Sequence, residues 1–126
     1  MSPILEPAQR AVSVVVLNWN GAAYLPRCLD ALQAQTFRDF DVMVVDNGST
    51  DASVDQVETR WPGFRVLRLE HNLGFAVANN RAAQVVRGRW LVFLNNDAFP
   101  QPDWLERLVE AALAWPAFSF FASRLV

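Results

Sequence analysis

The chain has 126 residues, 52% of them hydrophobic, and a formal net charge of -2, which fits one globular domain with a sizeable core. This near-neutral charge gives no electrostatic reason to expect a nucleic-acid partner. All eleven basic residues are arginine, and the absence of lysine excludes a Walker-type phosphate loop and a Schiff-base lysine within this chain.

The single cysteine, Cys28, excludes an intrachain disulfide and a cysteine-based zinc cluster, and we expect it in the core. No apolar run reaches the roughly eighteen residues of a membrane span, so no transmembrane segment is predicted. Residues 1–10 lack the apolar stretch of a secretory signal. We expect His71 at the surface and four tryptophans as packing residues, namely Trp61, Trp90, Trp104 and Trp115.

Apolar patterns predict strands and helices that alternate along the chain. In order, these are a strand at Val12–Leu17, a helix from Leu25, a strand at Phe40–Val45, a short helix from Val54 to Trp61, a strand at Phe64–Leu69, a helix from Phe75 to Gly88, a strand at Arg89–Leu94, a helix from Asp103 to Pro116 and a strand beginning at Phe118–Phe121.

This alternation is typical of an α/β fold with a mostly parallel sheet and helices on both faces. The valine-rich first strand indicates a strand buried on both faces, and the run Leu91–Leu94 indicates a buried strand. Arg65 and Arg68 indicate a more exposed third strand.

Three of the predicted strands end in asparagine and aspartate. The clusters are Asn18-Trp19-Asn20-Gly21, Asp46-Asn47-Gly48-Ser49-Thr50-Asp51 and Asn95-Asn96-Asp97. Open parallel sheets bind ligands outside the carboxyl ends of their strands. We therefore expect the three clusters to form one polar site.

Each cluster has a functional and a structural interpretation. Asp97 can supply a carboxylate to a hard divalent cation, and Asn96 can bond a sugar hydroxyl, or both can merely turn the chain and cap the next helix. Asp46 or Asn47 can bond the edge of a nucleobase. The Trp19 ring can stack on a base or fold back onto the sheet edge.

The neighbouring residues have similar alternatives. Gly48 allows a close backbone approach, and we interpret Ser49 and Thr50 as caps of the following helix. Asn79 and Asn80 either face the site or lie on an exposed helix face, because asparagine is a poor helix-interior residue.

Taken together, these segments resemble the family 2 glycosyltransferases of the GT-A fold. The matching pieces are Val12–Asn20, Gln35-Thr36-Phe37, Val44–Asp51, Asn72-Leu73-Gly74-Phe75 with Asn79-Asn80, and Leu94–Asp97 followed by Pro102–Leu105. The resemblance implies a Rossmann-like nucleotide-diphospho-sugar transferase fold. It implies an N-terminal extension at residues 1–11 and the nucleotide-sugar-binding portion of the domain at residues 12–126.

The resemblance also implies the ligands. A dTDP-, UDP- or GDP-sugar donor is expected, with Trp19 against the base, Asn96 at the ribose and Mg²⁺ or Mn²⁺ at Asp97. The implied nucleotide-sugar-binding residues are Asn18, Trp19, Asn20, Asp46, Asn47, Asn72, Gly74, Asn80 and Asn96. An acceptor hydroxyl of a glycan, lipid-linked or protein substrate then attacks the anomeric carbon with inversion. The Asn-Leu-Gly-Phe segment is similar to a branch that includes rhamnosyltransferases.

The chain departs from the family pattern in two ways. The family's D-x-D motif reads Asn95-Asn96-Asp97, with one carboxylate, and no candidate for the general base is found, so this base and the acceptor half are expected beyond Val126. The isolated chain is then either the donor half of an enzyme or a non-catalytic nucleotide-binding module. The absence of a Gly-rich phosphate loop and of G-x-G-x-x-G disfavours a nucleotidyltransferase and a dinucleotide oxidoreductase. We expect a role in cell-surface polysaccharide biosynthesis, in the cytoplasm or peripherally at the inner face of the plasma membrane.

Overall fold

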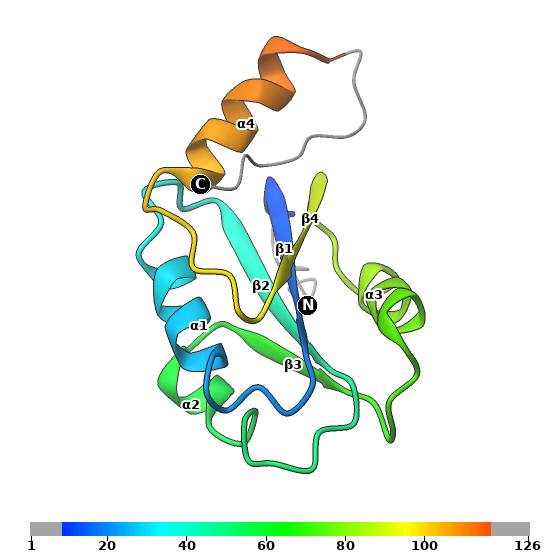
Figure 1. Cartoon of the computed structure of the whole chain (residues 1–126). Coiled ribbons are helices and arrows are strands. Elements are labelled where there is room, and N and C mark those ends of the chain that lie inside the picture. Colours follow the sequence, from blue (N-terminus) through cyan, green and yellow to red (C-terminus); the bar gives the residue numbers. More distant parts are fainter. Residues whose placement is uncertain (1–8, 117–126) are drawn as a thin grey trace, which may run out of the picture.

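A four-stranded parallel sheet is the centre of the computed structural model, which describes residues 9–116 (Figure 1). The strands are β1 (Val12–Asn18), β2 (Phe40–Asp46), β3 (Arg65–Arg68) and β4 (Trp90–Asn95). The helices are α1 (Leu25–Gln33), α2 (Val57–Arg60), α3 (Phe75–Ala83) and α4 (Trp104–Ala114). The strand order is β3-β2-β1-β4, with every pair parallel. The predicted alternation is confirmed, while the strand expected at Phe118–Phe121 lies outside the described residues.

Strand β1 lies between β2 and β4 and is almost wholly buried. On one face, Val14 and Val16 pack in a core that includes residues of α1, α2 and α4. On the other face, Val15 packs with Ala78 and Ala82 of α3. A strand covered on both faces is consistently apolar, so the valine run and the helices on both faces are confirmed.

Strand β4 differs from the expectation that it is buried. Its residues alternate in exposure, and Leu91 and Phe93 are 39% and 48% exposed. Both pair in register with β1 residues, but helix α3 contacts β1 and β2 instead. An apolar run alone does not show whether a strand is central or at the edge of a sheet. The exposed Arg65 and Arg68 on β3 confirm the expected exposure of that strand.

Two helices are shorter than predicted. Helix α2 covers only Val57–Arg60, because turns occupy residues 53–56. Helix α3 ends at Ala83, ahead of Gly88. The N–H of Gly88 donates to the Ser13 hydroxyl at 2.8 Å, and a Cβ at this glycine would overlap the Ser13 backbone. The close approach explains why glycine stands here without capping a helix.

The single cysteine and the tryptophans can be compared with their predictions. Cys28 and Trp61 are buried, and the Trp61 ring N–H donates to Asp30 at 2.9 Å. Trp90 and Trp104 pack against the main core. Trp115 is 59% exposed, so the prediction that it packs in the interior is wrong. His71 is exposed, as expected.

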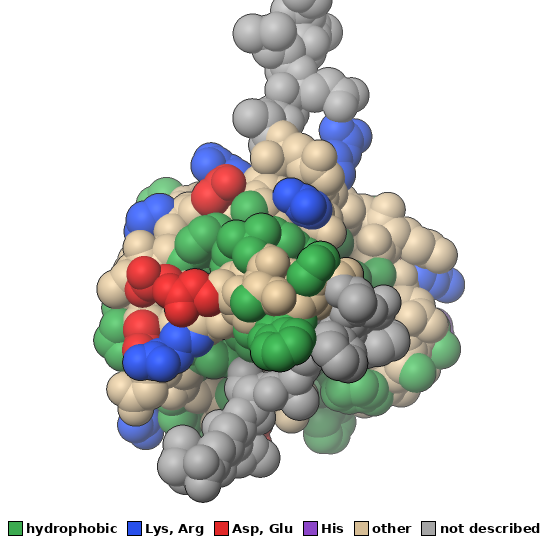
Figure 2. Space-filling view, turned by 90° about the horizontal axis from the view of Figure 1, so that it is seen from above, with side chains coloured by type: hydrophobic (Ala, Val, Ile, Leu, Met, Phe, Trp, Pro, Cys, Tyr) green, Lys and Arg blue, Asp and Glu red, His purple; other side chains and the backbone are tan. Residues whose placement is uncertain are grey.

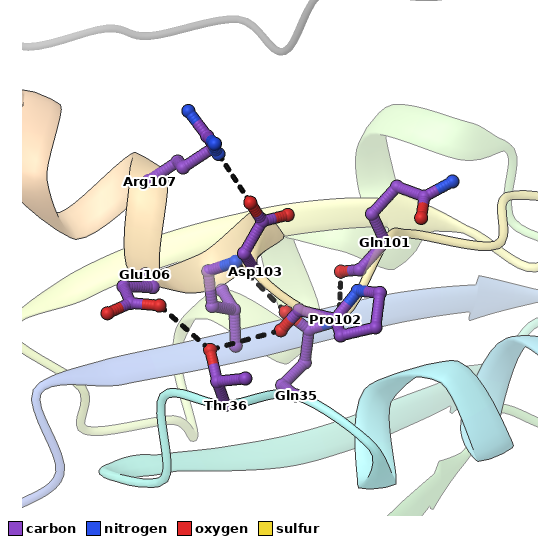
Figure 3. Close-up of polar contacts among 8 residues, drawn as sticks. Gln35, Thr36, Gln101, Pro102, Asp103, Glu106 and Arg107 are labelled. Atoms are coloured by element: carbon purple, nitrogen blue, oxygen red, sulfur yellow. Dashed lines mark hydrogen bonds and ion pairs between the residues drawn. The ribbon is translucent and has the colours of Figure 1, made fainter.

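A polar clamp fixes the segment that follows β4. Gln35, two residues after α1, donates from Nε2 to the carbonyl of Gln101 at 2.7 Å, and its Oε1 accepts the N–H of Leu105 at 3.0 Å (Figure 3). Thr36 donates its N–H to the Pro102 carbonyl at 2.8 Å and its hydroxyl to Glu106 at 2.9 Å. The start of α4 is thereby anchored to α1, and the loop that leads back to β4 is held at both ends.

The amino ends of the strands form the opposite side of the molecule from the polar loops. In Figure 2 this side shows hydrophobic side chains gathered in the centre, with acidic and basic side chains around them. None of the helices within residues 9–116 is long and apolar enough to cross a membrane.

Candidate functional site at the carboxyl ends of the strands

The three polar clusters meet at the carboxyl end of the sheet. Asn18 of β1 lies in register with Asp46 of β2, and Leu17 lies in register with Asn95 of β4. The loops that follow these strands are therefore neighbours, although the sequence separates them by tens of residues. Parallel strands in the order β2-β1-β4 place the polar residues on one edge, as the sequence predicts.

Asn18 is at the centre of this edge and is 0% exposed. Its Nδ2 donates to Asp46 Oδ1 at 3.1 Å and to the Ser53 hydroxyl at 2.9 Å. Its Oδ1 accepts Asn96 Nδ2 at 2.9 Å. One carboxamide thus connects the ends of β1, β2 and β4.

Asp46 is buried beneath the loop that follows β2. Its Oδ1 accepts the Ser49 hydroxyl at 2.5 Å, and its Oδ2 accepts the Ser49 N–H at 3.3 Å. The prediction that Ser49 and Thr50 cap a helix is wrong, because the helix does not begin until Val57. Ser49 instead orients the Asp46 carboxylate.

Asn20 fastens the first loop to the second. It has a left-handed backbone, with φ of 48°, which asparagine tolerates better than most residues. Its Oδ1 accepts the N–H groups of Thr50 at 2.8 Å and Asp51 at 3.2 Å. In return, Asp51 accepts the N–H of Ala22 at 3.1 Å. Hydrogen bonds from Ser53 and from the backbone of Ala22 lower the pKa of Asp51.

Asn47 holds the loop that precedes α3. Its Nδ2 donates to Asn72 Oδ1 at 3.0 Å, and its Oδ1 accepts the N–H of Leu73 at 2.9 Å. Asn72 also accepts the N–H of Gly74 at 2.8 Å. Both ends of the Asn47 carboxamide are therefore engaged within the protein.

Two glycines permit these loops to approach each other. A Cβ at Gly21 would overlap Asn96 Nδ2 and Asn18 Oδ1, the two atoms of one hydrogen bond. Gly48 has φ of +80°, and a Cβ there would lie 2.5 Å from the backbone of His71. The expectation that Gly48 allows a close backbone approach is confirmed. The close approach of Asn18 and Asn96 to Gly21 was not predicted from the sequence.

Trp19, Asn80 and Asp97 have exposed side chains at or near this edge. Trp19 is 54% exposed in the turn after β1, so its ring is available for stacking and is not folded into the core. Asn80 lies on the exposed face of α3, whereas Asn79 is buried. The Asn79 Oδ1 atom has no hydrogen-bond partner among the described residues.

Asp97 leaves β4 as an exposed carboxylate. Burial raises the pKa of the Cys28 thiol to about 12, and the negative charge of Asp97 contributes a smaller part of this increase. Cys28 is therefore a protonated core thiol, as expected of a buried cysteine. Within residues 9–116, no three His, Cys, Asp or Glu side chains gather as a metal site.

A single exposed carboxylate is compatible with a divalent cation that is coordinated partly by the protein and partly by the phosphates of a bound molecule. Mg²⁺ commonly takes one or two protein carboxylates and completes its shell with water and substrate phosphates. Asp97 can supply that ligand, and a complete protein cage is not required.

The serines were missed as members of the site. Ser49 and Ser53 bond Asn18 across 31 and 35 residues of sequence. Because hydroxyl side chains are common in turns and caps, a serine at these positions does not by itself indicate a functional site. Only the pairing of β1 with β2 brings them to Asn18.

Comparison with known proteins agrees with this arrangement. The model of the family "Glycosyl transferase family 2" matches residues 13–124. The PGL/p-HBAD biosynthesis glycosyltransferase of Mycobacterium tuberculosis is 34% identical over 100 residues, covering 76% of this chain and 39% of the relative. Glycosyltransferase AglE of Haloferax volcanii is 34% identical over 101 residues, covering 76% of this chain and 33% of the relative.

Solved structures show the same similarity. TarS 1–349 of S. aureus in complex with UDP-GlcNAc has a TM-score of 0.75 and 28% identity, covering 82% of this chain and 31% of that one. The mannosyltransferase PcManGT of Pyrobaculum calidifontis, in complex with GDP-Man and Mn²⁺, has a TM-score of 0.76 and 28% identity, covering 82% of this chain and 32% of that one.

The chain spans only 33% and 39% of the lengths of the two curated relatives. The family match nevertheless extends over nearly all of it, from residue 13 to residue 124. Together with the parallel sheet and its polar carboxyl edge, this match shows that the chain belongs to glycosyl transferase family 2 and forms the N-terminal portion of a GT-A fold.

Proposed function

We propose that this chain is the donor-binding half of an inverting glycosyltransferase that uses a nucleoside-diphosphate sugar and a divalent cation. The observation that carries the proposal is the hydrogen-bonded joining of three strand ends through Asn18, with Trp19 and Asp97 exposed beside them. The nucleotide sugars in the TarS and PcManGT structures support the donor class.

The base is expected to be bound between an aromatic face and a carboxylate. Trp19 offers the exposed ring. An ionised Asp46 can only accept hydrogen bonds, and its Oδ2 already accepts one weak bond from Ser49. It therefore favours a base with a ring N–H on its Watson–Crick edge, as in uracil, thymine or guanine, over cytosine and adenine, whose ring nitrogen at that position is an acceptor. This choice agrees with a UDP, dTDP or GDP donor.

The diphosphate is expected at the end of β4. Asn96 approaches the ribose, and Asp97 holds Mg²⁺ or Mn²⁺; the Mn²⁺ in the PcManGT structure supports this choice of ions. When bound, such a cation neutralises charge on the leaving diphosphate. Asn20, Asn47, Asn72 and Gly74 are expected at the loops around the donor, and Asn80, which is exposed on α3, is expected to contact it.

The transfer step itself involves the whole enzyme. An acceptor hydroxyl attacks the anomeric carbon and inverts its configuration as the bond to the nucleoside diphosphate breaks, and a general base takes the hydroxyl proton. The acceptor class, the role in cell-surface polysaccharide synthesis and the location in the cytoplasm or at the inner face of the plasma membrane belong to this proposal.

Calorimetry with UDP, dTDP, GDP, CDP and ADP, each with and without Mn²⁺, tests donor binding. We expect metal-enhanced binding of at least one of UDP, dTDP and GDP, and weaker binding of CDP and ADP. Trp19→Ala should weaken binding of the preferred nucleotide about 5- to 150-fold, as expected for the loss of base stacking worth about 1–3 kcal/mol. Trp115→Ala, which removes an equally exposed indole, is the matched control.

Two results separate the alternatives. Absence of binding for every nucleotide would contradict the donor-binding function. Binding by a longer protein that includes the downstream segments, without transfer from any nucleotide sugar, would favour the non-catalytic nucleotide-binding module.

A further inference from the structure

We infer that Asn18 is a positioning residue that fixes which end of the Asn96 carboxamide faces the donor. This inference rests on the proposed donor-binding function. It changes the role expected of Asn18, which is 0% exposed and therefore does not touch a ligand. Asn18 acts instead through the two side chains that it holds, Asp46 and Asn96.

The direction of the Asn18 amide follows from the chemistry of Asp46. An ionised carboxylate has no proton to donate, so the Asn18 group facing it must be the NH₂ group. The same NH₂ group donates to the Ser53 hydroxyl at 2.9 Å. A reversed amide would place a carbonyl oxygen against the Asp46 carboxylate and leave buried acceptors without donors, which is unfavourable.

The direction of Asn96 is then set by Asn18. Since Asn18 offers Asn96 only its carbonyl oxygen, Asn96 must turn its own NH₂ group inward, where the bond is 2.9 Å long. Among the described residues, Asn96 Oδ1 receives no hydrogen bond, and the side chain is half-buried. Asn96 therefore presents an acceptor oxygen to the donor molecule, and a ribose hydroxyl is the donor group that matches it.

Gly21 gives this arrangement its room. Because a Cβ at position 21 would overlap both atoms of the Asn18–Asn96 bond, Gly21→Ala should force the two amides apart while both remain in the chain. The Asp46 carboxylate thus sets the direction of the Asn18 amide, and Asn18 sets the direction of the Asn96 amide. The missing side chain of Gly21 leaves room for the hydrogen bond between Asn18 and Asn96.

The decisive variants are Asn18→Asp and Asn18→Ala. Asn18→Asp is nearly isosteric and keeps an acceptor for Asn96, but it sets a second carboxylate against Asp46. Asn18→Ala removes both bonds. Gln56→Glu makes the same amide-to-acid change at an exposed position and serves as the control. Gly21→Ala disrupts the same Asn18–Asn96 hydrogen bond without changing either asparagine, and it replaces the Asn18 variants if these do not fold.

The first measurement needs no ligand. NMR hydrogen exchange of the Asn96 side-chain NH₂ should show protection in the wild type and in Asn18→Asp. We expect protection to fall at least tenfold in Asn18→Ala and in Gly21→Ala. Equal protection in the wild type and in every folded variant would overturn the inference, whether or not any nucleotide binds.

The second measurement compares UDP with its 2′-deoxy and 3′-deoxy analogues in the presence of Mn²⁺. The wild type should prefer UDP over one of these analogues, and Asn18→Ala should lose most of that preference as well as at least tenfold in affinity for UDP. If Asn18 had only a structural role, Asn18→Ala would reduce the affinity for UDP and for its analogues by the same factor. That result would contradict the positioning role. Failure of the wild type to bind any nucleotide would instead contradict the proposed function, with the exchange measurement still deciding the role of Asn18.

Discussion

Gln35 and Leu105 are joined by a hydrogen bond across 70 residues of sequence, in which the buried glutamine oxygen accepts the first-turn N–H of α4 at 3.0 Å. Asp103, the residue before that helix, makes no side-chain capping bond. The cap of α4 is therefore supplied by the residue two positions after α1. Since α4 follows the loop that carries Asp97, this long-range cap also fixes one end of that loop.

Gln35→Ala should lower the free energy of unfolding by about 2 kcal/mol, because it leaves the Leu105 N–H and the Gln101 carbonyl without their buried partner. Urea denaturation followed by circular dichroism measures the change. Gln33→Ala, at the exposed last residue of α1, should lie within about 0.5 kcal/mol of the wild type. Equal stability of the two variants would show that the clamp contributes nothing.

Asn47→Ala should release the loop that precedes α3. The Asn47 carboxamide bonds Asn72 and the N–H of Leu73, so its removal should cost about 1–3 kcal/mol. The informative measurement is local, because amide exchange at Leu73 and Gly74 should accelerate far more than exchange in β1. A uniform acceleration throughout the sheet would point to global destabilisation instead.

The order of the elements and the edge that carries the site can be predicted from the sequence. Hydrophobic periodicity is local, and it locates β1, β2 and α1 to within a residue or two. The burial of β4 cannot be predicted in this way, because its four apolar residues suit a central strand as well as an edge strand. Its exposure depends on where α3 packs, and α3 lies over β1 and β2.

The site is less predictable than the fold for a related physical reason. The carboxyl ends of the strands indicate where the polar residues gather, but the direction of each amide depends on partners far away in the sequence. Asn18 was expected to meet the ligand, yet Ser53 and Asn96 surround it. The contact of Asn47 with the loop before α3 is likewise long-range, and no local pattern in the sequence indicates it.

Asp97→Asn should remove the metal dependence of nucleotide binding. The substitution keeps the size of the side chain but loses its charge, and a hard divalent cation strongly prefers an ionised oxygen ligand. Calorimetry with UDP should show that Mn²⁺ strengthens binding to the wild type at least tenfold and to Asp97→Asn very little. Asp55→Asn, at an exposed position in a turn, is the charge-matched control. Undiminished metal enhancement in Asp97→Asn would contradict the metal role.

The buried thiol of Cys28 predicts a specific loss of stability in alkaline, metal-free buffer. Burial, assisted by the Asp97 carboxylate, raises its pKa from an ordinary 9.0 to about 12 in the folded chain. Below pH 9 the thiol is protonated in both states and contributes no pH dependence. Between about pH 9 and 12 the unfolded chain releases the proton while the folded chain retains it, so unfolding becomes more favourable as pH rises, by up to about 1.4 kcal/mol per pH unit.

The difference in unfolding free energy between the wild type and Cys28→Ala isolates this effect from other groups that titrate at high pH. The wild type should lose its advantage over Cys28→Ala as pH rises from 9 towards 12, whereas the two proteins should show parallel behaviour below pH 9. Because the Asp97 charge contributes to the raised pKa, Asp97→Asn should shift the onset of thiol ionisation in the folded protein to lower pH. Thiol labelling of the folded protein would detect that shift, and rapid labelling of the wild type at pH 8 would show that Cys28 is accessible and ionised, contrary to the structure.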